Sequence, residues 1–244
     1  MSSDPASASR HGLARILSKR GICSRSDAAR LIIAGRVSIA GRVVRDPDHP
    51  TPASASIAID GVAVDRTAPL YLMLNKPRGL VTSTRDEKAR DTVYRCFDGA
   101  GLPWLAPVGR LDKASEGLLL FSNDPEWAAR ITDAASGPDK TYHVHVHRIP
   151  EAAMLVALQE GVVCEGERLH AKRASLLRAG EKNAWLEIVL DEGRNRQIRR
   201  LLAAFDIGVL RLLRVSIGGL VLGDLPKGQW RKLSAHEVAG LGGQ

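Results

Sequence analysis

Residues 109–120 read GRLDKASEGLLL, and this stretch sets the frame for both the fold and the chemistry of the chain. The apolar run over 117–122 predicts a buried strand, because it is too short for a buried helix. Asp112 falls in the turn before that strand, between Gly109 and Gly117. An aspartate in a turn commonly accepts hydrogen bonds from its own backbone. Taken alone, Asp112 therefore fits a structural turn residue better than a catalytic acid.

Strand and helix patterns are mixed on both sides of this stretch. Strand patterns occur over 70–74, 141–147, 185–190, 209–217 and 230–233. Helical spacing occurs over 127–131, 149–159 and 198–205, and the last of these has a one-sided apolar face. Because strands and helices do not alternate regularly, we predict an α+β body on a largely antiparallel mixed sheet.

The positive charge of the chain is concentrated near its N-terminal end. The 244 residues carry 35 Lys and Arg against 27 Asp and Glu, a formal net charge of +8. Nine of the basic residues lie within 10–45, where Asp27 is the only acid, and the rest of the chain is balanced. This distribution favours a polyanion-binding module joined to a neutral body, with a merely solvated cationic face as the alternative.

The basic region fits a small α/β module. Helical spacing starts at Leu13, and a second helical stretch follows Ser24, with Asp27 placed as in a capping box and Gly35 as the stop. A hairpin over 37–44 and a strand over 57–59 complete the pattern. We therefore divide the chain into a disordered tail (1–10), a small basic α/β RNA-binding domain (11–66), a larger α+β domain (67–235) and a second tail (236–244).

Several classes of protein and site are disfavoured. No apolar run approaches the roughly 20 residues that span a bilayer, and the N-terminal residues lack the apolar core of a secretory signal. Cys23, Cys96 and Cys164 are far apart, which leaves no Cys-x-x-Cys pair and fits a reducing cytoplasm. We find no glycine-rich phosphate loop and no Gly-x-Ser-x-Gly elbow, so a nucleotide cofactor is not supported.

The alternation His143-Val144-His145-Val146-His147 places three imidazoles on one face of a predicted strand. Imidazole is a good ligand for zinc, copper and nickel. Neighbouring positions on one face lie about 6.6 Å apart, which suits two ligands, but no nearby carboxylate or thiolate completes a site. We favour a solvent-facing strand with the valines packed inward and keep metal binding as the alternative.

Five segments, in order along the chain, resemble the motifs of RNA pseudouridine synthases. The segment around Asp112 resembles the family's Gly-Arg-Leu-Asp-x-x-(Ser/Thr)-x-Gly-Leu-Leu motif. The others are 75–79 (NKPRG), 140–142 (KTY), 193–200 (GRNRQIRR) and 223–231, so the resemblance spans residues 70–233. The segments 24–29 (SRSDAA) and 35–37 (GRV) resemble an S4-like RNA-binding domain. This pairing of domains is typical of the branch that modifies single uridines in ribosomal RNA.

The resemblance implies an isomerase that needs no cofactor and no metal, because the uracil leaves and returns within one reaction. It implies Asp112 as nucleophile, Tyr142 as the ring on which the flipped base stacks, and Arg199 as the cation that makes burial of Asp112 tolerable. Without it, Tyr142 would be a core aromatic residue and Arg199 a solvated arginine. Whether Asp112 attacks the base or the sugar stays open. We expect RNA contacts from Arg15, Lys19, Arg25, Arg36, Arg110, Arg194, Arg196 and Arg200.

The expected partner is ribosomal RNA, in the first place that of the large subunit (23S), with the small subunit (16S) as alternative. We expect a monomer in the cytoplasm with no membrane contact. A non-catalytic RNA-binding or ribosome-assembly protein would explain the charge equally well, and a methyltransferase would need a glycine-rich cofactor loop. Two segments depart from the family: Pro125 stands where glycine is common, and 136–139 match no motif.

Overall fold

The computed structural model describes residues 11–83 and 90–242 and divides the chain into two compact units. The first unit contains the described residues up to Leu70, with Ala100–Ala106 and Ser122–Pro125. The second contains the described parts of Tyr71–Gly99, Pro107–Phe121 and the chain from Glu126 onward. The predicted tail over 1–10 lies outside the described residues.

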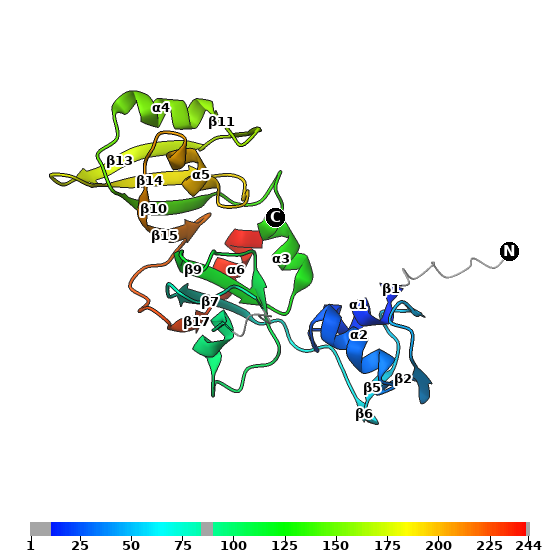
Figure 1. The fold of residues 1–244 in the computed structure, drawn as a ribbon. Helices are drawn as coiled ribbons and strands as arrows, with labels where there is room; N and C mark the ends of the chain where they lie inside the picture. Colours follow the sequence, from blue (N-terminus) through cyan, green and yellow to red (C-terminus); the bar gives the residue numbers. More distant parts are fainter. Residues whose placement is uncertain (1–10, 84–89, 243–244) are drawn as a thin grey trace. The chain divides into compact units, whose positions relative to one another are not determined.

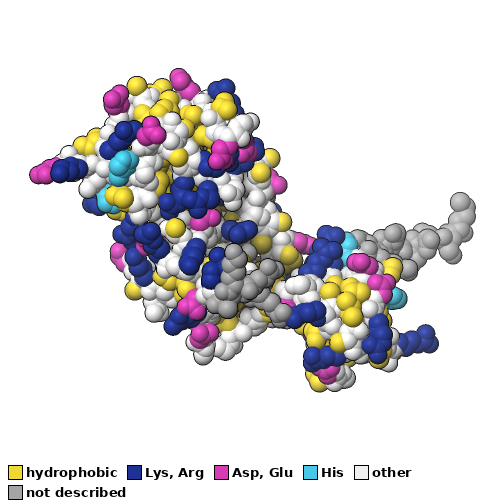
Figure 2. Space-filling model, in the orientation of Figure 1, with side chains coloured by type: hydrophobic (Ala, Val, Ile, Leu, Met, Phe, Trp, Pro, Cys, Tyr) yellow, Lys and Arg dark blue, Asp and Glu magenta, His cyan; other side chains and the backbone are white. Residues whose placement is uncertain are grey.

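The first unit is a small α/β module, as the sequence predicts. Helices α1 (Leu13–Lys19) and α2 (Arg25–Ile33) pack on each other over a core that includes Leu13, Leu17 and Ile32. A four-stranded sheet follows in the order β3 (Arg42–Val44), β2 (Val37–Ile39), β5 (Ile57–Ile59) and β6 (Val62–Ala63), and β1 (His11–Gly12) pairs with β4 (Pro50–Thr51). Lys and Arg side chains are spread over the surface of this unit (Figure 2).

Local signals explain where α2 begins and ends. The Ser24 hydroxyl accepts a hydrogen bond from the backbone N–H of Asp27 (3.0 Å) and donates one to the Asp27 carboxylate (2.6 Å). Gly35 follows the C-cap residue Ala34 with φ of +73°, the left-handed conformation that glycine adopts without strain. The predicted capping residue and the predicted stop are both confirmed.

The second unit is built on a nine-stranded mixed sheet, counted over the described residues (Figure 1). Its main order is β13-β14-β10-β15-β9-β7-β17, with β16 beside β15 and β8 beside β9. The pairs β13–β14, β14–β10, β10–β15, β15–β16 and β7–β17 are antiparallel and β15–β9 is parallel, which confirms the predicted α+β class. The strands are β7 (Tyr71–Lys76), β8 (Ala106–Val108), β9 (Glu116–Ser122), β10 (Lys140–Val146), β13 (Arg173–Ala179), β14 (Ala184–Leu190), β15 (Val209–Ile217), β16 (Leu220–Val221) and β17 (Trp230–Lys232).

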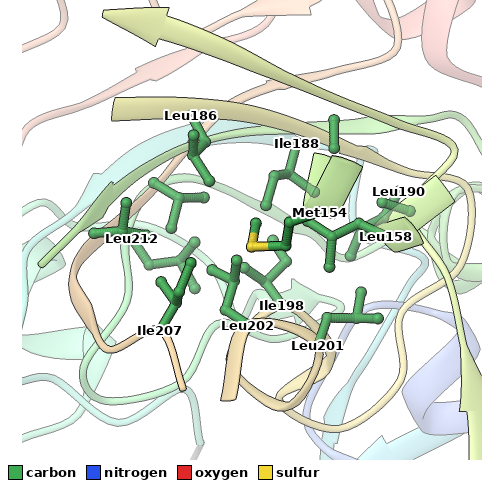
Figure 3. Close-up of a cluster of buried hydrophobic side chains, with 14 of the residues drawn as sticks. Met154, Leu158, Leu186, Ile188, Leu190, Ile198, Leu201, Leu202, Ile207 and Leu212 are labelled. Atoms are coloured by element: carbon green, nitrogen blue, oxygen red, sulfur yellow. The ribbon is translucent and has the colours of Figure 1, made fainter. Parts of the chain in front are cut away.

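Helices α4 (Ala152–Glu160) and α5 (Gln197–Ala203) cover one face of the β13–β15 half of this sheet. Figure 3 shows Met154 and Leu158 of α4 and Leu202 of α5 meeting Leu186 and Ile188 of β14. The predicted helix over 149–159 begins three residues late, because Pro150 restricts the residue before it and lacks a backbone N–H. The two-stranded ribbon β11 (Val162–Cys164) and β12 (Glu167–Leu169) follows α4.

The other half of the sheet packs on α3 (Pro125–Thr132) and on a C-terminal helix, α6 (Ala235–Gly242). Pro125, the departure from the family pattern, is the first residue of α3, a position where proline is favoured. A 3-10 helix, η1 (Val93–Phe97), precedes β8. None of the helices within the described residues is long and apolar enough to cross a membrane.

The prediction of a tail over 236–244 is wrong for residues 236–242, which form most of α6. Leu241 is buried, and the Trp127 indole donates a hydrogen bond to the carbonyl of Val238 (3.1 Å). Ser234 and Glu237 form a capping box: each side chain accepts from the other residue's backbone N–H. That Ser-x-x-Glu signal is present in the sequence, but the apolar partner, Trp127, lies more than a hundred positions away.

Candidate active site

Asp112 lies in the loop between β8 and β9, and the backbone of this loop is held from outside. The carbonyl oxygens of five consecutive residues, from Leu111 to Ser115, each accept a hydrogen bond. The donors are the Thr82 hydroxyl to Leu111 (2.7 Å), Lys76 Nζ to Asp112 (3.2 Å) and Ser115 (2.9 Å), Gly79 N–H to Lys113 (2.8 Å) and Arg199 Nη2 to Ala114 (3.3 Å). Among the described residues no hydrogen bond reaches the Asp112 carboxylate. The loop is thus fixed through its backbone, and the carboxylate is left for a ligand.

Lys76, at the end of β7, is fully buried below this loop. Its ammonium group donates to the carbonyls of Pro77 (3.2 Å), Asp112 (3.2 Å) and Ser115 (2.9 Å), which matches its three N–H groups. Burial lowers the pKa of Lys76 to about 8, although the charge of Asp112 acts in the opposite direction. The NKPRG segment drew attention to this region, but the sequence did not identify Lys76 as the support of the loop.

Gly117 allows β9 to approach β15 closely. The two strands pair in parallel at Gly117 and Arg214. A Cβ atom at position 117 would lie 2.9 Å from the Arg214 nitrogen and closer still to its carbonyl oxygen, and φ of Gly117 is +99°. A side chain at this position would push the strand that follows Asp112 away from the rest of the sheet.

Asp112 and Tyr142 line one cavity of about 610 Å³. Tyr142 is half-buried on β10 and packs against the cluster under α4 and α5. The cavity volume lies in the range of small-ligand sites. Asp112 and Tyr142, which the sequence analysis selected, therefore share a space large enough for a small ligand.

The floor of this cavity carries two cations that sequence reasoning missed. Arg214 is 5% exposed, lies opposite Tyr142 in the β10–β15 register, and donates from Nε to the carbonyl of Leu118 (2.7 Å). Lys140 also lines the cavity, and burial together with the charge of Arg214 lowers its pKa. The KTY motif contains Lys140, but only the strand pairing reveals Arg214 as its neighbour.

Arg199 does not make the predicted ion pair with Asp112 among the described residues. From α5 its guanidinium donates to the carbonyls of Ala114 (3.3 Å) and Val209 (3.4 Å). Burial and the nearby charge of Arg196 lower the pKa of Arg199, while the charge of Asp112 raises it. The guanidinium of Arg199 is bound to the carbonyl of Ala114 and not to the Asp112 carboxylate. Arg199 therefore influences Asp112 through the backbone of the loop and through its positive charge.

The other predicted RNA-binding arginines of this unit divide into two pairs. Arg110 and Arg196 are exposed and line the cavity. Arg194 is also exposed and lines the cavity, but Arg194 and Arg200 both pair with Glu167, at 2.8 Å for Arg200, whose side chain is only 19% exposed. Prior pairing with a carboxylate weakens the case for phosphate contact by Arg194 and Arg200.

The predicted RNA-binding residues of the first unit also differ in their partners. Arg15 and Arg25 are exposed on α1 and α2, and Lys19 is half-buried at the end of α1. Arg36 is tied to Asp60, with Nε 2.9 Å from Oδ1. Arg15 and Arg25 are therefore the stronger candidates for phosphate contact.

The three histidines of the alternating segment have three different environments. His147 lies beyond the end of β10, and its Nδ1 accepts from the backbone N–H of Gly208 (2.8 Å). His143 lies 3.7 Å from Glu187, and His145 stacks on Trp185. In the described part of the chain no three or more His, Cys, Asp or Glu residues are grouped to hold a metal ion.

Comparison with known proteins agrees with this arrangement. Residues 70–204 match the family model described as RNA pseudouridylate synthase. The chain belongs to the RNA pseudouridylate synthase family. Residues 12–52 of this synthase match the S4 domain model. The region matched by the synthase model includes Asp112, Tyr142 and Arg199. The chain is therefore an isomerase of this family, a pseudouridine synthase.

Relatives of the synthase match it over nearly their full length. The ribosomal large subunit pseudouridine synthase B of Bacillus subtilis is 34% identical over 232 residues, 94% of each chain. The ribosomal small subunit pseudouridine synthase A of Pseudomonas aeruginosa is 35% identical over 231 residues, 94% of this chain and 99% of its own. A crystal structure of a pseudouridylate synthase aligns with a TM-score of 0.66 at 32% identity, covering 95% of this chain and 99% of its own.

Proposed function

We propose that this synthase converts a uridine of ribosomal RNA to pseudouridine with Asp112 as the nucleophile. The observation that carries the proposal is the shared cavity of Asp112 and Tyr142, in which the loop is held by its backbone and the carboxylate is uncommitted. The two relatives above, a large-subunit and a small-subunit ribosomal pseudouridine synthase, support a ribosomal RNA substrate. Large-subunit RNA is our first candidate, on the likeness of the GRNRQIRR segment, and small-subunit RNA is the second.

The reaction breaks the bond between C1′ of the ribose and N1 of uracil and forms a bond between C1′ and C5. The C5 proton is lost and N1 gains a proton, so atoms and charge balance without an added reagent. Asp112 acts by attack either on the sugar, which releases uracil with the electron pair of the broken bond, or on the base. In the first route Lys140 and Arg214 place positive charge in the cavity that receives the detached ring.

The same proposal assigns the other groups. Flipping the uridine out of its stack costs a few kcal/mol, and stacking on Tyr142 returns about 1–3 kcal/mol. The side chains of Arg110 and Arg196 at the cavity can bind the flanking phosphates. We further infer a cytoplasmic location, because Cys23, Cys96 and Cys164 are all free thiols, as expected in a reducing compartment.

The test uses ribosomal RNA from a strain that lacks the gene. Wild-type protein should introduce pseudouridine at one position, found by chemical mapping of both ribosomal RNAs, and Asp112→Asn should bind the RNA but lose more than about a thousandfold in rate. Asp133→Asn is the matched control, since Asp133 lines the same cavity but its carboxylate bonds to Ala135 and Ser136 nearby. A rate for Asp112→Asn within about tenfold of the wild-type rate would contradict the role of Asp112 as nucleophile.

A further inference from the structure

We propose that the synthase has a second RNA-contact surface on the face of the β13–β14–β10–β15 strands opposite α4 and α5. This surface is built around a row of four side chains, Arg178, Trp185, His145 and Arg211, called here the outer row. The inference rests on the proposed function, because it takes ribosomal RNA as the occupant. It also assigns a role to His145, one of the alternating histidines that the catalytic cavity does not use.

The outer row crosses four neighbouring strands at one level. Arg178 of β13 is paired in register with Trp185 of β14, Trp185 with His145 of β10, and His145 with Arg211 of β15. The His145 and Trp185 rings are stacked, with centroids 4.8 Å apart and planes 4° from parallel. The guanidinium carbons of Arg178 and Arg211 lie 5.2 and 5.9 Å from the Trp185 ring centroid. These contacts hold both guanidinium groups beside the aromatic pair.

Strand alternation separates this row from the catalytic cavity. Val144 and Val146 of β10 point into the core under α4 and α5, so His143 and His145 point to the other face. The side chain of Arg211 is 37% exposed, and Arg178 is also exposed. Figure 2 shows imidazole, Lys and Arg side chains gathered over this part of the sheet.

The charges of the face favour a polyanion. Among the described residues Arg178 has no carboxylate partner, and a guanidinium stacked on an indole keeps its N–H groups for phosphate oxygens. Arg211 and Lys227 share one buried carboxylate, Glu116, at 2.9 and 2.7 Å, which leaves one positive charge in excess. Glu187, an acid on the same face, is already bound by Arg173 (2.9 Å).

The row also connects to the catalytic loop. Arg199 binds the carbonyl of Val209, and Arg211, two residues further along β15, binds Glu116, the first residue of β9 after the loop. Arg78 Nη1 lies 3.5 Å from the carbonyl of Leu210, between these two positions. The guanidinium groups of Arg199, Arg78 and Arg211 thus lie along residues 209–211 of β15, between the Asp112 loop and the outer row. An RNA strand that leaves the cavity along this path would meet phosphate-binding groups throughout.

The experiment measures binding of the full-length protein to the ribosomal RNA that it modifies, as a function of salt. Arg178→Gln should weaken affinity about fivefold at 0.15 M salt and reduce the slope of log K against log salt by about 0.7–0.9, the value for one lost phosphate contact. The matched control is Arg173→Gln, which removes the same charge from the same strand where Glu187 already neutralises it. That control should change affinity less than twofold.

Two further variants keep the result interpretable. Arg178→Lys retains the charge and should retain most of the salt slope. If Arg178→Gln lowers the unfolding temperature, Arg178→Met replaces it, because methionine removes the charge but keeps apolar contact with Trp185. Equal effects of Arg178→Gln and Arg173→Gln, or no effect of either, would overturn the outer row as an RNA site and leave the face to another partner. Failure of wild-type protein to form pseudouridine in that RNA would instead refute the proposed function.

Discussion

The Asp112 loop and the N-terminal basic unit are organised by opposite physical means. The loop places one carboxylate by committing five consecutive backbone carbonyls to donors from Lys76, Gly79, Thr82 and Arg199. The basic unit presents exposed side chains such as Arg15 and Arg25 on the surface of two short helices. Catalysis requires a fixed geometry, whereas attraction to a polyanion requires only net charge in the right region.

This difference predicts how each region responds to substitution. Buried donors in the loop act together, so removing one disturbs the position of Asp112, the proposed nucleophile, and the stability of the unit. Exposed arginines act nearly independently, so each removal changes affinity by a small, salt-dependent amount. The following predictions test the contrast, from the largest expected effect to the smallest.

Gly117→Ala should have the largest effect on stability. The added Cβ would overlap the backbone of Arg214, and φ of +99° is strained for alanine, so we expect a loss on the order of 3 kcal/mol in the free energy of unfolding. Denaturant titration measures this loss, and activity should fall with it. Wild-type stability of Gly117→Ala would show that the parallel β9–β15 contact is not needed to hold the loop.

Lys76→Met should cost about 2 kcal/mol in the free energy of unfolding, because buried carbonyls of the loop lose their donor. The wild-type protein should also show a pH signature. With a pKa of about 8 when folded and about 10.5 when unfolded, Lys76 binds its proton more weakly in the folded state. Its contribution to stability is thus unfavourable below pH 8 and is relieved as the pH rises toward 10.5.

The difference between wild type and Lys76→Met isolates this effect from other groups that titrate in the same range. Denaturation at several pH values should show wild-type stability rising relative to that of Lys76→Met above pH 8. A constant difference would mean that the pKa of Lys76 is not lowered by its burial.

Arg199→Ala should lower the free energy of unfolding by about 1–2 kcal/mol, through loss of the bonds to Ala114 and Val209. A direct buried pair with Asp112 would give about 3–5 kcal/mol instead. Thermal or chemical unfolding of the variant separates the two cases. Activity should fall in either case, and full activity would remove Arg199 from the positioning of Asp112.

Arg25→Gln should leave stability nearly unchanged and lower the salt slope of RNA binding by about 0.9 per lost phosphate contact. Arg30→Gln on the same helix is the control, since Arg30 is already paired with Asp27. Binding titrations at several salt concentrations measure both slopes. Equal slopes for wild type and Arg25→Gln would show that this arginine does not touch RNA.

Much of the fold and part of the site follow from contiguous residues. The Ser24 cap, the Gly35 stop, the hairpin over 37–44 and the apolar face of α5 were predictable, because each depends on groups a few positions apart. The Ser234 capping box belongs to the same class, and closer attention to it would have predicted α6. The resemblance to the family's motifs likewise implied that Asp112 and Tyr142 share one site.

The sequence by itself therefore determined the class of fold, the basic module and the candidate nucleophile. Only the tertiary structure decided that Lys76 and Arg199 hold the loop by its carbonyls, that Arg214 lies opposite Tyr142 on the neighbouring strand, and that His145 stacks on Trp185. These contacts join residues from 36 to 85 positions apart, and their geometry depends on which strands become neighbours. Periodicity and capping are local properties of a chain, whereas the partner of a buried donor is set by the packing of the whole sheet.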